Sequence, residues 1–357
     1  MLKIHLLLLL VLAQCAVSSS SWAGSESDSV HNTEMYAGQF GQVQIPSTVR
    51  PDGKVGGGDP GLPGHLLPMG KHRPPKAIAE TSYPLDPQDF YTNFVLPGRP
   101  VLIKGGAREL QLDTKWTDKE LSRRHGREEV LVERQKKEKR GIEPGVMSLK
   151  KFLGSYKKRG IYLAAQPTME LLEDVPLPSL LSCEEMHEHT YTLNMWMSSG
   201  GTTSLMHLDD AENVLHMIDG VKRVVLVSPQ QTVDVYADEA VHAPTSPIDP
   251  EAVDMVLFPR FYNVTWEAAK VEAGDALYIP RGYWHQVNSD PGRNLALNVW
   301  WHHPPSSKIS GETQDLPVSE IVKVMLDQKR AWPERMTCAR PSVFGEKTLA
   351  DCNWVEE

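Results

Sequence analysis

The stretch "HLDDAENVLHMIDGVKR", residues 207–223, decides how this sequence is interpreted. His207 and Asp209 flank a single leucine, and Lys222 follows on the next apolar run. Residues two apart in a strand point the same way, so His207 and Asp209 are expected to project together. An imidazole and a carboxylate facing one point suit a divalent transition metal. One more histidine would complete the two-histidine, one-carboxylate face that non-haem iron enzymes use.

A second motif, "AGDALYIPRGYWHQV" (273–287), supplies that histidine. The pattern predicts a turn at Gly274, a buried strand, a second turn and then His285 at the start of another strand. A lone histidine-x-aspartate pair is short enough to arise often by chance. The pair becomes much more specific when a lysine and this second motif follow it. We therefore predict that His207, Asp209 and His285 bind one metal ion.

The surrounding region, residues 191–303, has a β pattern. Short runs rich in β-branched and aromatic residues are separated by Gly, Pro and Asp. Many short strands with turns between them predict a barrel or jelly roll. The fold class is therefore mainly β with flanking helices.

Other regions have a different composition. Residues 24–77, rich in Gly, Ser, Pro and Asp, are predicted to be a flexible spacer. A lead-in of mixed helices and strands is predicted over 78–190, before a core barrel over 191–305. Beyond it, the tail 306–357 contains "PVSEIVKVMLDQKRAW", whose apolar residues fall at helical spacing. That helix is expected to pack on the barrel or on a second subunit, which would make a homodimer.

The N-terminal sequence predicts passage through the secretory pathway. Residues 1–23 combine a short basic start, an apolar run and small residues, which is typical of a signal peptide; an uncleaved anchor is the alternative. No other stretch is long enough to span a bilayer. In an oxidising compartment Cys338 and Cys352 could close a disulfide, and the sequon at Asn263 could carry a glycan. The net charge of −9 argues against a nucleic-acid partner.

With these motifs, residues 78–303 resemble the JmjC-domain oxygenases, which depend on Fe(II) and 2-oxoglutarate and fold as a double-stranded β-helix of the cupin type. The likeness extends from "FYTNFVLPGRPVLIKGG" through "GDALYIPRGYWH". It is strongest to the small JmjC protein hydroxylases: the asparaginyl hydroxylase that inhibits hypoxia-inducible factor, and the lysyl and arginyl hydroxylases. The resemblance implies that Fe(II) is the metal and 2-oxoglutarate the co-substrate.

The resemblance also implies roles for residues around the metal. Lys222, Tyr162 and Ser204 match positions that bind the distal carboxylate of 2-oxoglutarate. Two further residues, Asn213 and Asn298, match polar pocket residues near the metal-bound end, and Trp300 matches an aromatic residue on the substrate side. Each has an alternative: Tyr162, Asn213 and Asn298 could be ordinary core residues, and Arg223 could face inward in place of Lys222. Strand register decides between neighbours, because they face opposite sides.

The predicted function is therefore hydroxylation of a protein or peptide side chain in the secretory pathway, in the endoplasmic reticulum lumen or after secretion. Two alternatives stay open. One is a JmjC demethylase acting on an N-methyl group, and the other is a non-catalytic cupin-like binding module that keeps the metal as a structural element.

Overall fold

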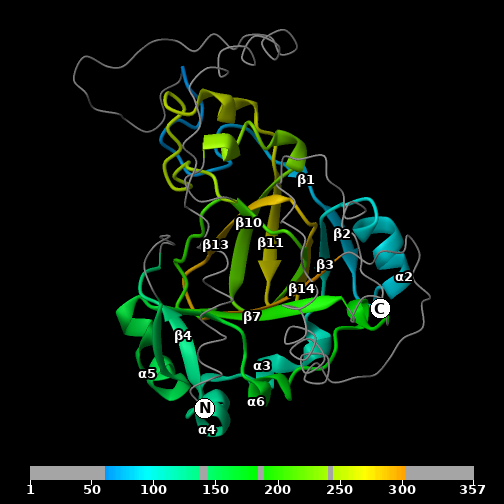
Figure 1. The fold of residues 1–357 in the computed structure, drawn as a ribbon, viewed down its shortest axis with the longest axis vertical. Helices are drawn as coiled ribbons and strands as arrows, with labels where there is room; N and C mark the ends of the chain where they lie inside the picture. Colours follow the sequence, from blue (N-terminus) through cyan, green and yellow to red (C-terminus); the bar gives the residue numbers. More distant parts are fainter. Residues whose placement is uncertain (1–60, 137–143, 184–188, 240–243, 303–357) are drawn as a thin grey trace, which may run out of the picture.

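The computed structural model describes residues 61–136, 144–183, 189–239 and 244–302. Two β-sheets face each other in this part of the chain, and short helices cover the outside of the larger one (Figure 1). The strands are β1 (Lys76–Ala77), β2 (Ala79–Ser82), β3 (Val101–Lys104), β4 (Glu129–Glu133), β5 (Gly145–Ser148), β6 (Tyr162–Ala165), β7 (Thr190–Ser198), β8 (His207–Leu208), β9 (Glu212–Asp219), β10 (Val221–Val227), β11 (Glu267–Glu272), β12 (Ala276–Ile279), β13 (Trp284–Ser289) and β14 (Asn294–Trp301).

Helices and helical turns connect these strands. They are α2 (Pro87–Phe90), the π-helical turn η1 (Tyr91–Val95), η2 (Arg108–Leu110), α3 (Leu112–Lys115), α4 (Asp118–His125), α5 (Leu149–Arg159), α6 (Met169–Leu172), η3 (Ser179–Leu181), η4 (Pro229–Gln231), η5 (Ala237–Glu239) and η6 (Pro259–Asn263). Side chains cap the first turns of two helices: the Thr117 hydroxyl accepts from the Glu120 amide in α4, and the Ser148 hydroxyl accepts from the Lys151 amide in α5.

The two sheets form the two walls of the barrel. The smaller wall has the order β1-β11-β10-β13-β8, and the larger has the order β2-β3-β12-β9-β14-β7-β6-β4-β5. Figure 1 shows β7 crossing the view below the upright strands β10 and β11, with α3, α4 and α6 beneath it. The predicted jelly-roll, cupin-like fold is confirmed. The strands of the lead-in extend the larger sheet at both ends.

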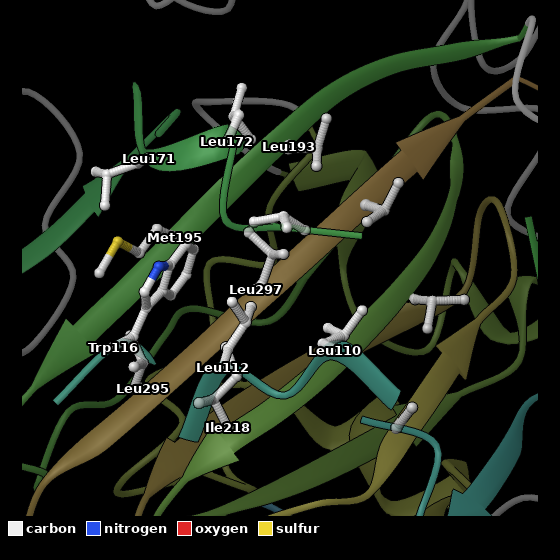
Figure 2. Close-up of a cluster of buried hydrophobic side chains, with 14 of the residues drawn as sticks. Leu110, Leu112, Trp116, Leu171, Leu172, Leu193, Met195, Ile218, Leu295 and Leu297 are labelled. Carbon is white, nitrogen blue, oxygen red and sulfur yellow. The ribbon is translucent and has the colours of Figure 1, made fainter. Parts of the chain in front are cut away.

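The outer face of the larger sheet is buried by the lead-in. Apolar side chains of β7 and β14 point toward helical segments of the lead-in, where they contact the fully buried Trp116 (Figure 2). The labelled members of this outer core are Leu110, Leu112, Trp116, Leu171, Leu172, Leu193, Met195, Ile218, Leu295 and Leu297. Burial of this face explains why every residue of β14 is buried rather than only alternate ones.

A second, smaller core fills the barrel between the two sheets. Its members alternate in sequence with those of the outer core: Leu215 and Met217 of β9 lie inside, whereas Val214 and Ile218 lie outside. The same alternation on β14 places Ala296 inside, between Leu295 and Leu297. This two-residue period determines which polar residues of these strands face the interior.

Residues 229–239 and 244–264, between β10 and β11, form a third cluster outside the smaller sheet and are called the 229–264 segment here; the N-terminal segment 61–75 lies across them. The Val253 amide donates to the Leu67 carbonyl, the Leu66 amide donates to the Val253 carbonyl, and the His72 ring contacts the Val264 carbonyl at 2.7 Å. In Figure 1 the blue N-terminal segment lies beside the yellow-green 229–264 segment. The predicted spacer boundary at 77 is therefore too late, because backbone pairing orders residues whose composition suggests a linker.

Strand β11 of the smaller sheet lacks the sequence pattern of a β-strand. β11 reads "EAAKVE", and Ala, Glu and Lys favour helices more than strands. Pairing with β10 overrides that preference and turns Ala269 and Val271 into the barrel.

Several predictions lie outside the described residues: the signal peptide 1–23, the tail 306–357 with its helix, and the pair Cys338 and Cys352. Cys183 is buried and is not oxidised to a disulfide. Within the described part of the chain, none of the helices has the length and apolar character needed to cross a membrane.

Candidate metal and co-substrate site

The three predicted metal ligands come together at one end of the barrel. His207 on β8 is paired with His285 on β13, and Asp209 lies just beyond the short strand β8. One ligand atom from each of the three residues lies within 4.8 Å of the other two. The two imidazole rings have their centroids 4.2 Å apart. The sequence separation of the motifs is thus closed by a single strand pair.

Backbone carbonyls set the tautomer of both histidines. Nδ1 of His207 contacts the Leu205 carbonyl at 2.8 Å, and Nδ1 of His285 contacts the Tyr283 carbonyl at 3.0 Å. A carbonyl oxygen only accepts, so each Nδ1 carries a proton, and in the neutral ring each Nε2 has a lone pair. This arrangement is typical of metal-binding histidines. The donor set of two Nε2 atoms and a carboxylate therefore fits a divalent iron ion.

Asp209 is oriented by two hydrogen bonds to one carboxylate oxygen. The Trp300 indole N–H donates to Oδ2 at 2.8 Å, and the Asn213 amide donates to the same atom at 3.2 Å. Burial disfavours the charged carboxylate, but His285, His207 and these hydrogen bonds outweigh it and hold the pKa of Asp209 below its usual value. The residue is thus kept as an anion suited to a cation.

The two ligand-bearing segments are also tied together by contacts that involve no ligand atom. The Gly282 amide donates to the Asp209 carbonyl at 2.9 Å, and the Arg281 amide donates to the Glu212 carboxylate at 3.0 Å. Gly282 has a φ of +78°, which favours glycine in this turn. The Tyr278 hydroxyl donates to Glu212 at 2.6 Å; burial and that carboxylate raise the pKa of Tyr278, so it remains a donor.

Lys222 faces into the barrel from β10. Its side chain is buried, whereas Arg223 is exposed and forms an ion pair with Asp290 at 2.9 Å. The predicted register, with Lys222 inside and Arg223 outside, is confirmed. Among the described residues no carboxylate forms an ion pair with Lys222, and burial alone lowers its pKa to about 8. Its role in binding 2-oxoglutarate stays a prediction.

The other predicted pocket residues have distinct positions. Asn298 donates to Asn213 at 2.8 Å, which continues the hydrogen-bond chain to Asp209. Tyr162 lies on the barrel side of β6, because the alternate residue Leu163 packs in the outer core. Trp300, predicted on the substrate side, places its indole N–H on Asp209.

Ser204 differs most from its predicted role. Its hydroxyl accepts from the Val287 amide at 2.9 Å and donates to the Leu205 carbonyl at 3.0 Å. These contacts occupy its only proton inside the protein, so it is not poised to donate to a carboxylate.

Ser289 is the residue that sequence reasoning missed. Its hydroxyl accepts from the Lys222 ammonium at 2.9 Å inside the barrel. The signal was present, since Ser289 lies four residues after His285 on one strand and hence on the same face.

The comparisons with known proteins agree with this geometry. Residues 87–307 match the cupin-like domain family. Lysine-specific demethylase 8 of Xenopus tropicalis is 27% identical over 224 residues, which are 60% of this chain and 50% of that protein. Jumonji C domain-containing protein 5 of Drosophila melanogaster is 31% identical over 135 residues, 37% of this chain and 33% of that protein.

The name of a third relative refers to tRNA. The tRNA wybutosine-synthesizing protein 5 of Gallus gallus is 32% identical over 136 residues, 38% of this chain and 40% of that protein. The chain thus matches half or less of the length of these relatives. Their names support the JmjC oxygenases as a group, and the narrower resemblance to the asparaginyl, lysyl and arginyl hydroxylases stays a prediction.

Proposed function

The chain belongs to the cupin-like domain family, and on that premise we propose that it is an Fe(II)- and 2-oxoglutarate-dependent oxygenase that hydroxylates a protein side chain. The observation that carries the proposal is the convergence of His207, Asp209 and His285 in the same barrel as the buried, inward-facing Lys222. A metal face and a buried cation on the inner side of one barrel suit a co-substrate with a metal-binding end and an anionic end.

The chain's own residues would bind and orient the reactants. Both histidines present Nε2, and Trp300 and Asn213 hold Asp209 in place as the third ligand. Lys222 would bind the free carboxylate of 2-oxoglutarate, and the apolar barrel interior would exclude water. Iron bound here would supply oxidative decarboxylation of 2-oxoglutarate coupled to oxidation of a C–H bond.

The first test is co-substrate turnover. Purified protein loaded with Fe(II) should convert 2-oxoglutarate to succinate, and the rate should rise with a peptide substrate. The same measurement separates an enzyme from a non-catalytic binding module. Absence of both turnover and 2-oxoglutarate binding in metal-loaded protein would refute the proposal.

N-methyl demethylation is the second candidate, and the names of the relatives favour it: Lysine-specific demethylase 8 is among them. Both reactions begin with oxidation of a C–H bond, so the site geometry suits either. Mass spectrometry of secretory-pathway proteins from cells with and without the enzyme would separate the two. Hydroxylation adds one oxygen atom to a peptide, whereas demethylation removes a methyl group. An oxidised RNA in place of a protein would refute the proposed substrate class.

We also propose that the protein acts in the secretory pathway. The apolar run in residues 1–23 supports this, and Asn263 of the sequon is exposed at the end of η6, where a glycan could be attached. N-terminal sequencing and glycosidase digestion of the protein from cells test it. A mature chain beginning near residue 24 is expected, and a cytosolic chain that retains residues 1–23 would contradict the proposal.

A further inference from the structure

The inner faces of β10 and β13 form a row that leads away from the metal ligands. Along this pair, Leu226 lies opposite His285, Val224 opposite Val287, and Lys222 opposite Ser289. Ser289 is four residues from His285, about 13 Å along the strand at ~3.3 Å per residue. The row therefore begins at a metal ligand, passes two valines and ends at a lysine and a serine.

The far end of this row has unused hydrogen-bonding capacity. Lys222 and Ser289 are only 8% and 5% exposed, and they contact each other at 2.9 Å. An ammonium has three protons to donate and the serine accepts only one of them, while accepting leaves the serine's own proton available. A buried ammonium whose partner is a neutral hydroxyl is poorly compensated. Both groups are thus suited to receive an anion.

We propose that Ser289 is a co-substrate-binding residue, which donates its hydroxyl to the same terminal carboxylate that Lys222 binds. This inference rests on the proposed function and adds a residue that determines co-substrate specificity. Val224 and Val287 lie between the two ends, where they would contact the methylene groups of a 2-oxo diacid. The pocket would then reject a 2-oxo monoacid, because Lys222 would remain buried beside an uncharged chain end.

Ser204 strengthens the assignment by being engaged elsewhere. It matches the position expected to donate to the carboxylate, yet its proton is used on the Leu205 carbonyl. Ser289 has the same chemical group in the place where Lys222 needs a partner.

The test measures binding by isothermal titration calorimetry of Mn(II)-loaded protein, so that no turnover occurs. Ser289→Ala is expected to weaken 2-oxoglutarate binding roughly 10- to 100-fold, as for a hydrogen bond to a charged group. Ser289→Thr keeps the hydroxyl and should stay close to wild type. Binding of 2-oxopentanoate, a monoacid of the same chain length, should change little in Ser289→Ala. In Ser289→Ala, the dissociation constant for 2-oxopentanoate divided by that for 2-oxoglutarate should therefore fall below the wild-type ratio.

Ser246→Ala is the matched control, because Ser246 is 3% exposed and its hydroxyl accepts from the Ile248 amide in the 229–264 segment. It should bind 2-oxoglutarate as wild type does. Should Ser289→Ala fail to fold, Ser289→Cys keeps the side-chain size with a weaker donor and replaces it.

The outcomes separate the two proposals. A wild-type protein that binds Mn(II) but not 2-oxoglutarate refutes the proposed function. If the wild type binds 2-oxoglutarate, and Ser289→Ala binds both 2-oxoglutarate and 2-oxopentanoate with wild-type affinities, the role of Ser289 is refuted. The proposed function is not affected by that result.

Discussion

The two ends of the row of inward-facing residues along β10 and β13 differ in how completely the protein satisfies their polar groups. At the metal end, both histidines donate to backbone carbonyls and Asp209 accepts from Trp300 and Asn213. At the far end, Lys222 has the Ser289 hydroxyl and no described carboxylate as an ion-pair partner. The first end is held in its geometry by the protein itself, whereas the second lacks a charged partner among the described residues and is where we propose that an anion binds.

The metal end is therefore preorganised, whereas the buried charge at the far end lowers the stability of the folded protein. Burial lowers the pKa of Lys222 from 10.5 to about 8. The folded state therefore binds its proton less tightly than the unfolded state. Below about pH 8 the buried charge reduces stability by about 3 kcal/mol, and the loss disappears as the pH rises to the unfolded value. The proposed binding of a carboxylate by Lys222 would account for keeping such a charge inside a barrel.

The largest expected effect is at the metal end. His285→Ala removes one of three ligands, so turnover should fall to background and Fe(II) affinity should drop sharply. Metal binding and succinate release measure it, with circular dichroism to show that the fold survives. His302→Ala, at the exposed end of the described chain, is the control and should remain active. Full turnover in His285→Ala would show that the metal lies elsewhere.

Lys222→Met is the next largest change, and it acts in opposite directions on binding and stability. Loss of the cation should weaken 2-oxoglutarate binding by roughly 2–5 kcal/mol, as for truncating one side of a buried charge pair. Replacing a poorly compensated buried charge by an apolar side chain should raise the free energy of unfolding by roughly 1–4 kcal/mol. Titration calorimetry and denaturant unfolding near neutral pH measure the two effects.

Arg223→Met on the same strand is the matched control for Lys222. Arg223 is exposed and its ion pair with Asp290 lies on the surface, so both effects should be small. If the Lys222 variant bound 2-oxoglutarate normally and only the Arg223 variant lost binding, the anion would have to bind outside the barrel.

Trp300→Phe tests whether the hydrogen bonds that orient Asp209 contribute to metal affinity. It removes the indole N–H that orients Asp209 and keeps an aromatic ring, so metal affinity should fall about 10- to 100-fold. Trp266→Phe loses an indole hydrogen bond to the Arg73 carbonyl, away from the site, and should keep wild-type affinity. Equal Mn(II) affinities in both variants would mean that Asp209 needs no such brace.

The metal end was easier to predict from sequence than the far end, for a physical reason. His207 and Asp209 are two residues apart, and the motif that carries His285 made the otherwise common pair specific; the pairing of β8 with β13 brings the three together. Lys222 was assigned inward by the family resemblance, because alternation alone left Arg223 as an alternative. Ser289 was missed because a serine in a strand has many ordinary roles, and only the register of β10 against β13 places it beside Lys222.

Contacts between segments far apart in the chain could also not be predicted from the sequence. The packing of 61–75 on the 229–264 segment depends on contacts between residues almost 200 positions apart, such as His72 with Val264. The composition of 61–75 is that of a linker, and β11 has the composition of a helix. In both cases tertiary pairing overrides local preference.

The smallest predicted effect is the pH dependence of co-substrate binding, which arises from the far end alone. Burial lowers the pKa of Lys222 to about 8 in the free protein, and its neighbours across the sheet, Val271 and Ser289, do not titrate in this range. A bound carboxylate favours the ammonium and raises that pKa. Affinity should therefore be constant from about pH 7 up to about 8, and then weaken about tenfold for each further pH unit. Calorimetry of Mn(II)-loaded protein over this range measures the slope.

Lys222→Arg is the control for this prediction. The arginine keeps its charge over the whole pH range, so the affinity of this variant for 2-oxoglutarate should not change with pH. A flat profile in the wild type, or the same slope in the arginine variant, would show that the group that titrates is not Lys222.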